Sequence, residues 1–117
     1  MTHPTGPSNV YIRKLARKLW KTKRPIWRDV SKRLMAPQKN RVEVNLAKLE
    51  RLTQQGETIV VPGKILANGT LEKSLTIACK AISKSAREKI AASKSKLITI
   101  EELLEKNPTG TGVRIII

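Results

Sequence analysis

Positive charge is concentrated in the first 41 residues of this 117-residue chain, and this segregation limits the fold more than any other feature of the sequence. Residues 1–41 contain twelve Lys or Arg and one acid, Asp29, a net charge of +11. Residues 42–117 contain twelve Lys or Arg and eight acids, a net charge of +4. Like charges at the density of the first segment repel one another and favour an anionic partner. We therefore expect a basic arm over residues 1–41 joined to a small globular domain over residues 42–117.

The arm has the pattern of two amphipathic helices. Ser8 or Asn9 is a good cap for a helix that ends near Lys21. Pro25 suits the first turn of a second helix, which ends before Pro37. At helical spacing each helix gathers its apolar residues on one face, away from its cations. The residues expected on these apolar faces are Ile12, Leu15, Ala16, Leu19, Ile26, Trp27, Val30 and Leu34.

Aromatic residues are scarce, and all of them lie in the arm: Tyr11, Trp20 and Trp27. Trp27 is on an apolar face and is expected in the core. Trp20 lies at the margin of such a face, so the pattern leaves its burial open. Stacking of bases on aromatic rings is therefore not expected to be the main binding mode.

The basic faces of the arm predict a polyanionic partner. The cations of the first helix have no acid four residues away to pair with, and bound phosphates would offset their mutual repulsion. Nucleic acid is the first candidate and an anionic membrane surface the second. The basic residues of the arm expected to contact RNA are Arg13, Lys14, Arg17, Lys18, Lys21, Lys23, Arg24, Arg28, Lys32, Arg33, Lys39 and Arg41.

Residues 42–117 alternate short strand patterns with short helix patterns, which indicates one small α/β domain. A helix is expected after Asn45, and two more are expected at the capping boxes that begin with Ser85 and with Thr99. Asn107-Pro108 ends the last helix. The pattern does not decide between parallel and antiparallel pairing. The strands are expected near residues 42–44, 58–61, 64–66, 75–82, 97–99 and 113–117.

The segment Pro62-Gly63-Lys64 follows an apolar strand, as the phosphate-binding loop of a nucleotide-binding protein does. Such a loop has a glycine five positions before the Gly-Lys pair and a Ser or Thr after it, but Thr58 and Ile65 occupy these positions here. We therefore expect a tight turn between two short strands, with Gly63 in a left-handed conformation. Lys64 then presents a cation from this turn.

Residues suited to catalysis or metal binding are few. The chain has one histidine, His3, and one cysteine, Cys79, which cannot supply a zinc site between them. Cys79 shares one side of a strand pattern with Leu75, Ile77 and Ala81, so a buried and unreactive thiol is expected. We expect no enzymatic activity, no cofactor and no small-molecule substrate. A single cysteine and the lack of a long apolar stretch favour a cytosolic protein that does not span a membrane.

Several stretches resemble the archaeal and eukaryotic large-subunit ribosomal protein eighteen family, which shares a superfamily with large-subunit protein fifteen. The resemblance spans nearly the whole chain in order, and the short length is similar to that of the archaeal members. The stretches that carry it are PIWRDV (25–30), VEVNLAKLER (42–51), TIVVPGKILANGTL (58–71), SAREKI (85–90) and ITIEELLEKNPTGTGVRII (98–116).

This resemblance implies a structural protein of the large subunit, with ribosomal RNA and neighbouring ribosomal proteins as partners and no catalysis of its own. It also implies a single small α/β domain of irregular β-β-α turns, preceded by a basic N-terminal helical segment that lies on RNA. Arg28, Arg41, Asn45 and Lys64 fall in the family's recurring motifs and are candidates for RNA or structural contacts.

Two alternatives to RNA binding come from the arm. Its two helices could form a DNA-binding helix-turn-helix, although the second helix has no Asn or Gln before Pro37 with which to read bases. The first helix could instead lie on a membrane surface with Trp20 at the interface. We favour RNA over DNA because the second helix lacks these base-reading side chains, and over a membrane surface because Leu15 and Leu19 have an intramolecular core available to them.

Overall fold

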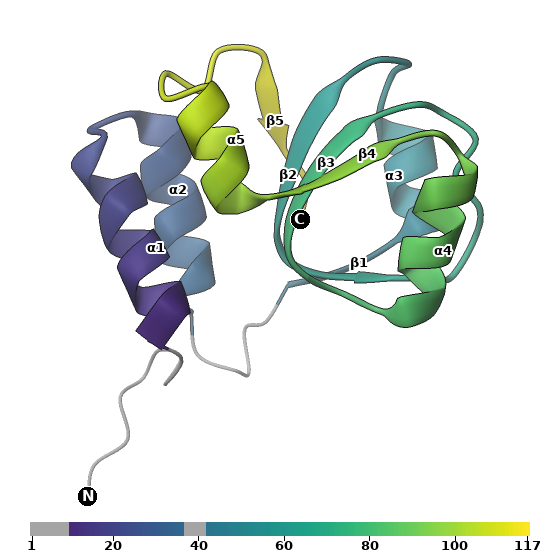
Figure 1. The fold of residues 1–117 in the computed structure, drawn as a ribbon, viewed down its shortest axis with the longest axis horizontal. Coiled ribbons are helices and arrows are strands. Elements are labelled where there is room, and N and C mark those ends of the chain that lie inside the picture. Colours follow the sequence, from purple (N-terminus) through teal and green to yellow (C-terminus); the bar gives the residue numbers. More distant parts are fainter. Residues whose placement is uncertain (1–9, 37–41) are drawn as a thin grey trace, which may run out of the picture.

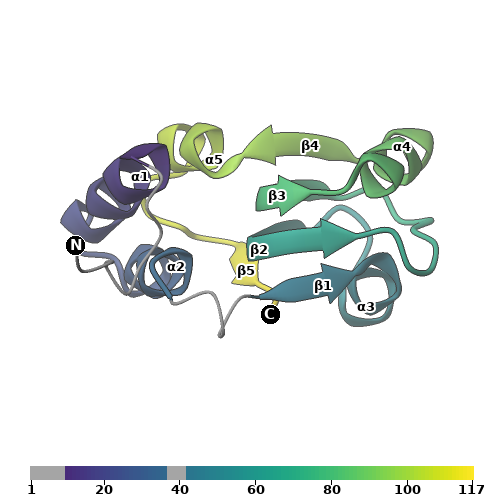
Figure 2. The same ribbon diagram turned by 90° about the horizontal axis from the view of Figure 1, so that it is seen from below.

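A parallel five-stranded sheet organises the fold in the computed structural model, which describes residues 10–36 and 42–117. The strand order is β1-β2-β3-β4, and β5 also pairs with β2 (Figure 2). Every pairing is parallel, which the sequence pattern had left open. The strands are β1 (Glu43–Asn45), β2 (Thr58–Leu66), β3 (Thr76–Ile82), β4 (Lys96–Thr99) and β5 (Val113–Ile115).

Within the described residues, five helices cover the two faces of the sheet (Figure 1). Helices α3 and α4 pack on one face, and α1, α2 and α5 pack on the other. The result is a single α/β domain with three layers, and the basic N-terminal segment forms part of the layer that contains α5. The helices are α1 (Val10–Lys21), α2 (Pro25–Leu34), α3 (Leu46–Leu52), α4 (Lys84–Ala92) and α5 (Ile100–Lys106).

Strand β2 is the centre of this arrangement. Its first half pairs with β5 and its second half with β1 along one edge, while β3 pairs along the other. Ile59 and Val61 point into the cluster under α3 and α4, whereas Val60 points into the cluster under α1, α2 and α5. A strand buried on both faces needs an uninterrupted apolar run rather than alternation, and residues 59–61 supply it.

Most elements predicted from local patterns are confirmed. Helices α1 and α2 end close to the expected residues, and Trp27 is fully buried. Thr99 caps α5, accepting a hydrogen bond from the backbone N–H of Glu102 at 3.0 Å. The expected caps of α1, Ser8 and Asn9, lie outside the described residues.

The capping residue predicted for α4 is wrong. The helix begins at Lys84, and Ser83 rather than Ser85 accepts the capping hydrogen bond, from the backbone N–H of Ala86 at 3.2 Å. Two serines with the same capping chemistry stand two residues apart. The capping box favoured the second, but β3 ends at Ile82, so Ser83 is the first residue available as a cap.

The predicted turn at Pro62-Gly63 is also wrong, because β2 runs through both residues as one strand. Gly63 is not among the glycines with positive φ. The pairing with β3 shifts between Val61 and Lys64, so β2 has one residue more than β3 there, a bulge that accommodates proline. The glycine is needed for space: a Cβ at this position would lie 2.2 Å from the carbonyl oxygen of Val42.

The side of β3 that carries Cys79 is less buried than its pattern predicted. Cys79 is half-buried at the border of the α3 and α4 cluster, and Ala81 is exposed. Strand β4 pairs with Thr76–Cys79 only, so the edge of β3 beyond Cys79 has no neighbouring strand on that side within the described residues.

Replacing Gly63 with valine should destabilise the fold by about 1–3 kcal/mol, because the new side chain must displace the backbone of Val42. Thermal or urea unfolding measures this change. Lys64→Ala is the matched control, since it leaves the hydrogen bond from the Lys64 N–H to the Val42 carbonyl intact. An unchanged unfolding midpoint for Gly63→Val would contradict the close approach of the two segments.

The Cys79 thiol should react slowly although it is partly exposed. Burial raises its pKa from 9.0 to about 11, which lowers the thiolate fraction near neutral pH about a hundredfold. The labelling rate with a disulfide reagent should therefore rise about tenfold per pH unit up to that value. The chain in denaturant is the control, and equal rates in the folded and unfolded states would contradict this prediction.

Candidate nucleic-acid interface

The hairpin of α1 and α2 carries most of the predicted RNA-contacting residues, and its inner side is firmly held. Ser31 is buried, and its hydroxyl donates a hydrogen bond to the carbonyl of Ala16 at 2.7 Å, which joins the two helices. The indole N–H of Trp27 donates to the carbonyl of Pro108 at 3.0 Å, which joins α2 to the loop after α5. These contacts fix the hairpin on the rest of the fold, so its outer side is held in one orientation.

Three cations of α1 point directly away from the apolar face and form a row that we call the α1 ridge: Lys14, Arg17 and Lys21. At 100° per residue they fall within a narrow sector opposite Leu15 and Leu19. All three side chains are exposed and make no hydrogen bond or ion pair within the described residues. The ridge is a set of neighbouring cations without acid partners, as the sequence predicted.

Lys18 lies to one side of the ridge and has an acid partner. Its Nζ is 2.7 Å from Oε1 of Glu101 at the start of α5, and the Tyr11 hydroxyl donates to Oε2 of the same carboxylate at 3.2 Å. The hydrogen bond and the charge of Lys18 lower the pKa of Glu101, and the same contact raises the pKa of Lys18. The sequence analysis could not foresee this partner of Lys18, because a pairing between residues 83 positions apart has no local signal.

On the other side of the ridge, Trp20 lies beside α2 and is only partly buried. It is 41% exposed, and the Arg28 guanidinium carbon lies 4.6 Å from its ring centre and the Lys32 amino group 5.9 Å. The Nε of Arg28 also donates to the Trp20 carbonyl at 3.2 Å. We call Trp20, Arg28 and Lys32 the Trp20 cluster. Local patterns did not reveal it, because its members come from two helices.

The acid of the arm, Asp29, does not neutralise this cluster. Its carboxylate accepts from the Nε of Arg33, one turn later in α2, at 3.1 Å. Asp29 thus compensates part of the charge of Arg33, which the sequence placed among the RNA contacts. Lys23 and Arg24, in the turn between the helices, are exposed, and Lys23 has a φ of 60°. A positive φ at a lysine is uncommon and allows the short connection between the helices.

The remaining predicted contacts are not on the hairpin. Lys64 is half-buried in β2, opposite Glu43 in the pairing with β1. Asn45 precedes α3 as its N-terminal cap residue, but its side chain makes no capping hydrogen bond. Lys39 and Arg41 lie outside the described residues. The structure thus brings the predicted residues from Arg13 to Arg33 together and separates Asn45 and Lys64 from them.

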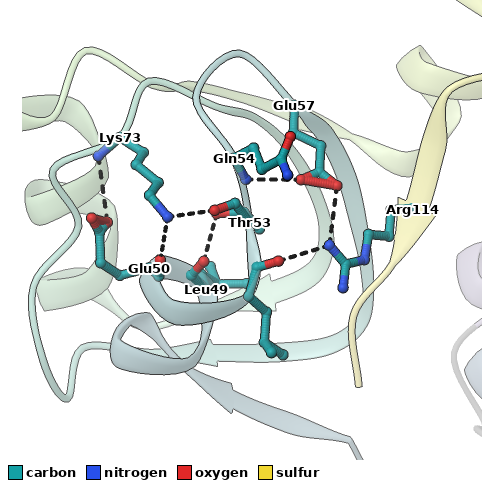
Figure 3. Close-up of polar contacts among 8 residues, drawn as sticks. Leu49, Glu50, Thr53, Gln54, Glu57, Lys73 and Arg114 are labelled. Atoms are coloured by element: carbon teal, nitrogen blue, oxygen red, sulfur yellow. Dashed lines mark hydrogen bonds and ion pairs between the residues drawn. The ribbon is translucent and has the colours of Figure 1, made fainter.

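Several cations of residues 42–117 hold the fold together (Figure 3). Lys73 donates to the carbonyls of Glu50, at 2.6 Å, and Thr53 at the end of α3. Arg114 donates to the carbonyl of Leu52 at 2.7 Å. Cations at a helix C-terminus satisfy unpaired carbonyls and oppose the negative end of the helix dipole. These residues are therefore part of the framework and not of a free basic surface.

Residues 10–36 and 42–117 contain neither a membrane-spanning helix nor a cluster of metal ligands. No helix there is both long and apolar enough to cross a membrane. This part of the chain also contains no group of three or more His, Cys, Asp or Glu side chains arranged to hold a metal ion.

Residues 5–117 match the family described as ribosomal protein 60S L18 and 50S L18e. The chain belongs to this family. The large ribosomal subunit protein eL18 of Methanopyrus kandleri is 46% identical, over 97% of this chain and 96% of its own length. The eL18 proteins of Pyrobaculum aerophilum and Methanoregula boonei are 44% and 50% identical, over 98% and 78% of this chain and 98% and 75% of theirs.

Membership in this L18 family confirms the resemblance found in the sequence. The family consists of structural proteins of the large ribosomal subunit, so the chain is a ribosomal constituent and not an enzyme. Its place is the ribosome, in the cytoplasm, and its relatives are of the archaeal type.

The contact between Lys18 and Glu101 predicts the titration of that carboxylate. Because Lys18 is the main cause of the lowered pKa, Lys18→Gln should raise the pKa of Glu101 toward its ordinary value of 4.5. Tyr11→Phe should raise it less. NMR titration of the side-chain carboxyl carbon measures both, and Arg17→Gln is the control, because it removes a charge from the same helix without touching Glu101. The ion pair of Lys18 and Glu101, which joins α1 to α5, is present at neutral pH and is lost as the pH falls through the pKa of Glu101.

Proposed function

We propose that this L18-family protein binds ribosomal RNA of the large subunit through the outer side of its α1–α2 hairpin. Residues 1–41 act as the RNA-binding arm, and residues 42–117 act as the globular domain that carries it. The α1 ridge supports this most directly, since Lys14, Arg17 and Lys21 are exposed, adjacent and without acid partners among the described residues. Phosphate groups relieve such repulsion, and their binding releases condensed counterions.

The charge balance of the hairpin favours a polyanion over a smaller acidic partner. Asp29 is the sole acid in residues 10–36, and Arg33 engages it. Glu101 compensates Lys18 from outside the hairpin. The cations that remain point to a ligand with charges repeated along its length, which describes an RNA backbone. Neighbouring ribosomal proteins are the further partners that we propose.

The proposed contacts fall into three groups by their environment. The α1 ridge binds phosphate directly, as do Arg13 and the turn residues Lys23 and Arg24. Arg28 and Lys32 contribute from the Trp20 cluster, while Lys18 and Arg33 are held by acids and contribute less. Lys39, Arg41, Asn45 and Lys64 form the third group, which the sequence proposes as RNA contacts: Asn45 and Lys64 lie apart from the hairpin, and Lys39 and Arg41 lie outside the described residues. RNA should be recognised mainly by its shape and backbone, because the α1 ridge and the cations of the Trp20 cluster contact phosphates and do not read base edges.

Neutralising the α1 ridge should weaken RNA binding and reduce its salt dependence. In Lys14→Gln/Arg17→Gln/Lys21→Gln, the slope of log K against log salt should fall by about 2–3 if each residue meets one phosphate. Filter binding to in vitro transcribed large-subunit ribosomal RNA over a range of salt concentrations measures this slope.

A matched control, Arg51→Gln/Lys84→Gln/Lys96→Gln, also removes three positive charges, but from the other side of the sheet and its edge. These exposed side chains lie on α3, at the start of α4 and on β4, respectively, and the control should keep most of the salt slope. Equal slopes for the ridge variant and the unmodified protein would place the RNA surface elsewhere. Tight, sequence-specific binding to double-stranded DNA would instead favour the helix-turn-helix alternative.

A further inference from the structure

The Trp20 cluster has a composition that phosphate binding alone does not explain. The ridge carries cations only, whereas the cluster places an indole ring between the two helices with cations above it. Trp20 is 41% exposed, while the core beneath the hairpin is already closed by Trp27 and Leu19, both fully buried. A large ring left half in water is thus available for a contact outside the chain.

Arg28 is held in place by two contacts with the same residue. Its Nε donates to the Trp20 carbonyl at 3.2 Å, and its guanidinium carbon lies 4.6 Å from the centre of the Trp20 ring. Its two terminal amino groups make no hydrogen bond within the described residues. A guanidinium that is fixed at one nitrogen keeps a planar pair of donors for an oxyanion, and little side-chain freedom remains to be lost on binding.

Lys32 adds a second cation one helical turn later. Its amino group lies 5.9 Å from the ring centre and has no hydrogen bond or ion pair within residues 10–36 and 42–117. Two cations four residues apart on a helix repel each other, and Asp29, the nearest acid in sequence, is engaged by Arg33. The cluster therefore combines an indole ring that is 41% exposed with two cations whose charge no acid compensates within the described residues.

We propose that the Trp20 cluster binds one unpaired RNA nucleotide, with its base stacked on the indole of Trp20 and its phosphate held by Arg28 and Lys32. The inference rests on the proposed function and specifies the RNA element that the hairpin recognises. Bases paired in an A-form duplex have no free face, so a stacked base must come from a loop, a bulge or a strand end. The ridge holds the backbone, and the cluster selects an unstacked nucleotide beside it.

Two substitutions of Trp20 distinguish stacking of a base on an aromatic face from a contact that needs only a large apolar side chain. Trp20→Phe keeps an aromatic face and should retain most of the affinity for in vitro transcribed large-subunit ribosomal RNA. Trp20→Leu keeps an apolar side chain without that face and should bind roughly 5- to 140-fold more weakly, the range expected for loss of one stacked base. The salt slope should stay unchanged in Trp20→Leu, because no charge is removed. In Arg28→Gln the slope should fall by about 0.7–0.9.

Fluorescence quenching by acrylamide gives an independent readout on the unmodified protein. Trp27 is fully buried and Trp20 is 41% exposed, so quenching reports Trp20. A single-stranded oligouridine should protect Trp20 from acrylamide at saturation, whereas an RNA duplex of equal length should protect it far less.

Each contrary result has a defined meaning. If Trp20→Leu binds as tightly as the unmodified protein, or if single-stranded RNA leaves quenching unchanged, no base stacks on the indole. If Trp20→Leu lowers the salt slope as much as Arg28→Gln does, the ring only positions the guanidinium, and the stacking proposal is wrong. If the unmodified chain binds ribosomal RNA without salt dependence, the proposed function itself fails, and the Trp20 site fails with it.

Discussion

The burial of β2 on both faces is the constraint on which the rest of this structure depends. Ile59, Val60 and Val61 are fully buried, and they alternate between two separate apolar clusters. A sheet with both faces apolar must be covered by helices on both sides. Helices α3 and α4 cover one face, and α1, α2 and α5 cover the other (Figure 1). The basic N-terminal helices are thus required for the core, because without them Val60 and Ala78 would face water.

This requirement explains how so basic a hairpin is stable before any partner binds. Like charges along α1 disfavour the isolated helix, but Ile12, Leu15 and Leu19 bury their side chains against α2 and the sheet. Burial of side chains of this size contributes about 1.5–3 kcal/mol each, whereas a like-charge pair on a helix costs about 0.2–0.5 kcal/mol. Packing therefore outweighs the repulsion, and the cations are carried in fixed positions at a modest cost in stability.

Local patterns predicted the elements of this fold well, and they failed where a feature depends on segments distant in sequence. Periodicity correctly gave α1, α2 and the buried Trp27, and capping chemistry gave the start of α5 at Thr99. Pro62-Gly63 carries a turn signature, but its conformation is set by pairing with β3 and by Val42 across the sheet. The candidate site shows the same division. The α1 ridge follows from helical spacing alone, whereas the bond of Lys18 to Glu101 and the Trp20 cluster depend on tertiary packing.

The orientation of each cation decides whether its charge is available to a partner. Because some cations bind backbone carbonyls, the number available to an anionic partner is smaller than the net charge of +15 suggests. Lys73 and Arg114 bind carbonyls at the end of α3 (Figure 3). Lys89 donates to the carbonyls of Ala67 and Gly69, so all three charges stabilise the fold. The charges of the ridge and of Lys32 have no such role within the described residues, and in the Trp20 cluster Arg28 alone binds a carbonyl, that of Trp20. Because packing on the sheet already orders their helices, binding does not have to supply the free energy of folding the hairpin. We therefore propose that this rigid, outward row of cations beside one exposed ring selects RNA whose own fold presents phosphates and an unpaired base in matching positions.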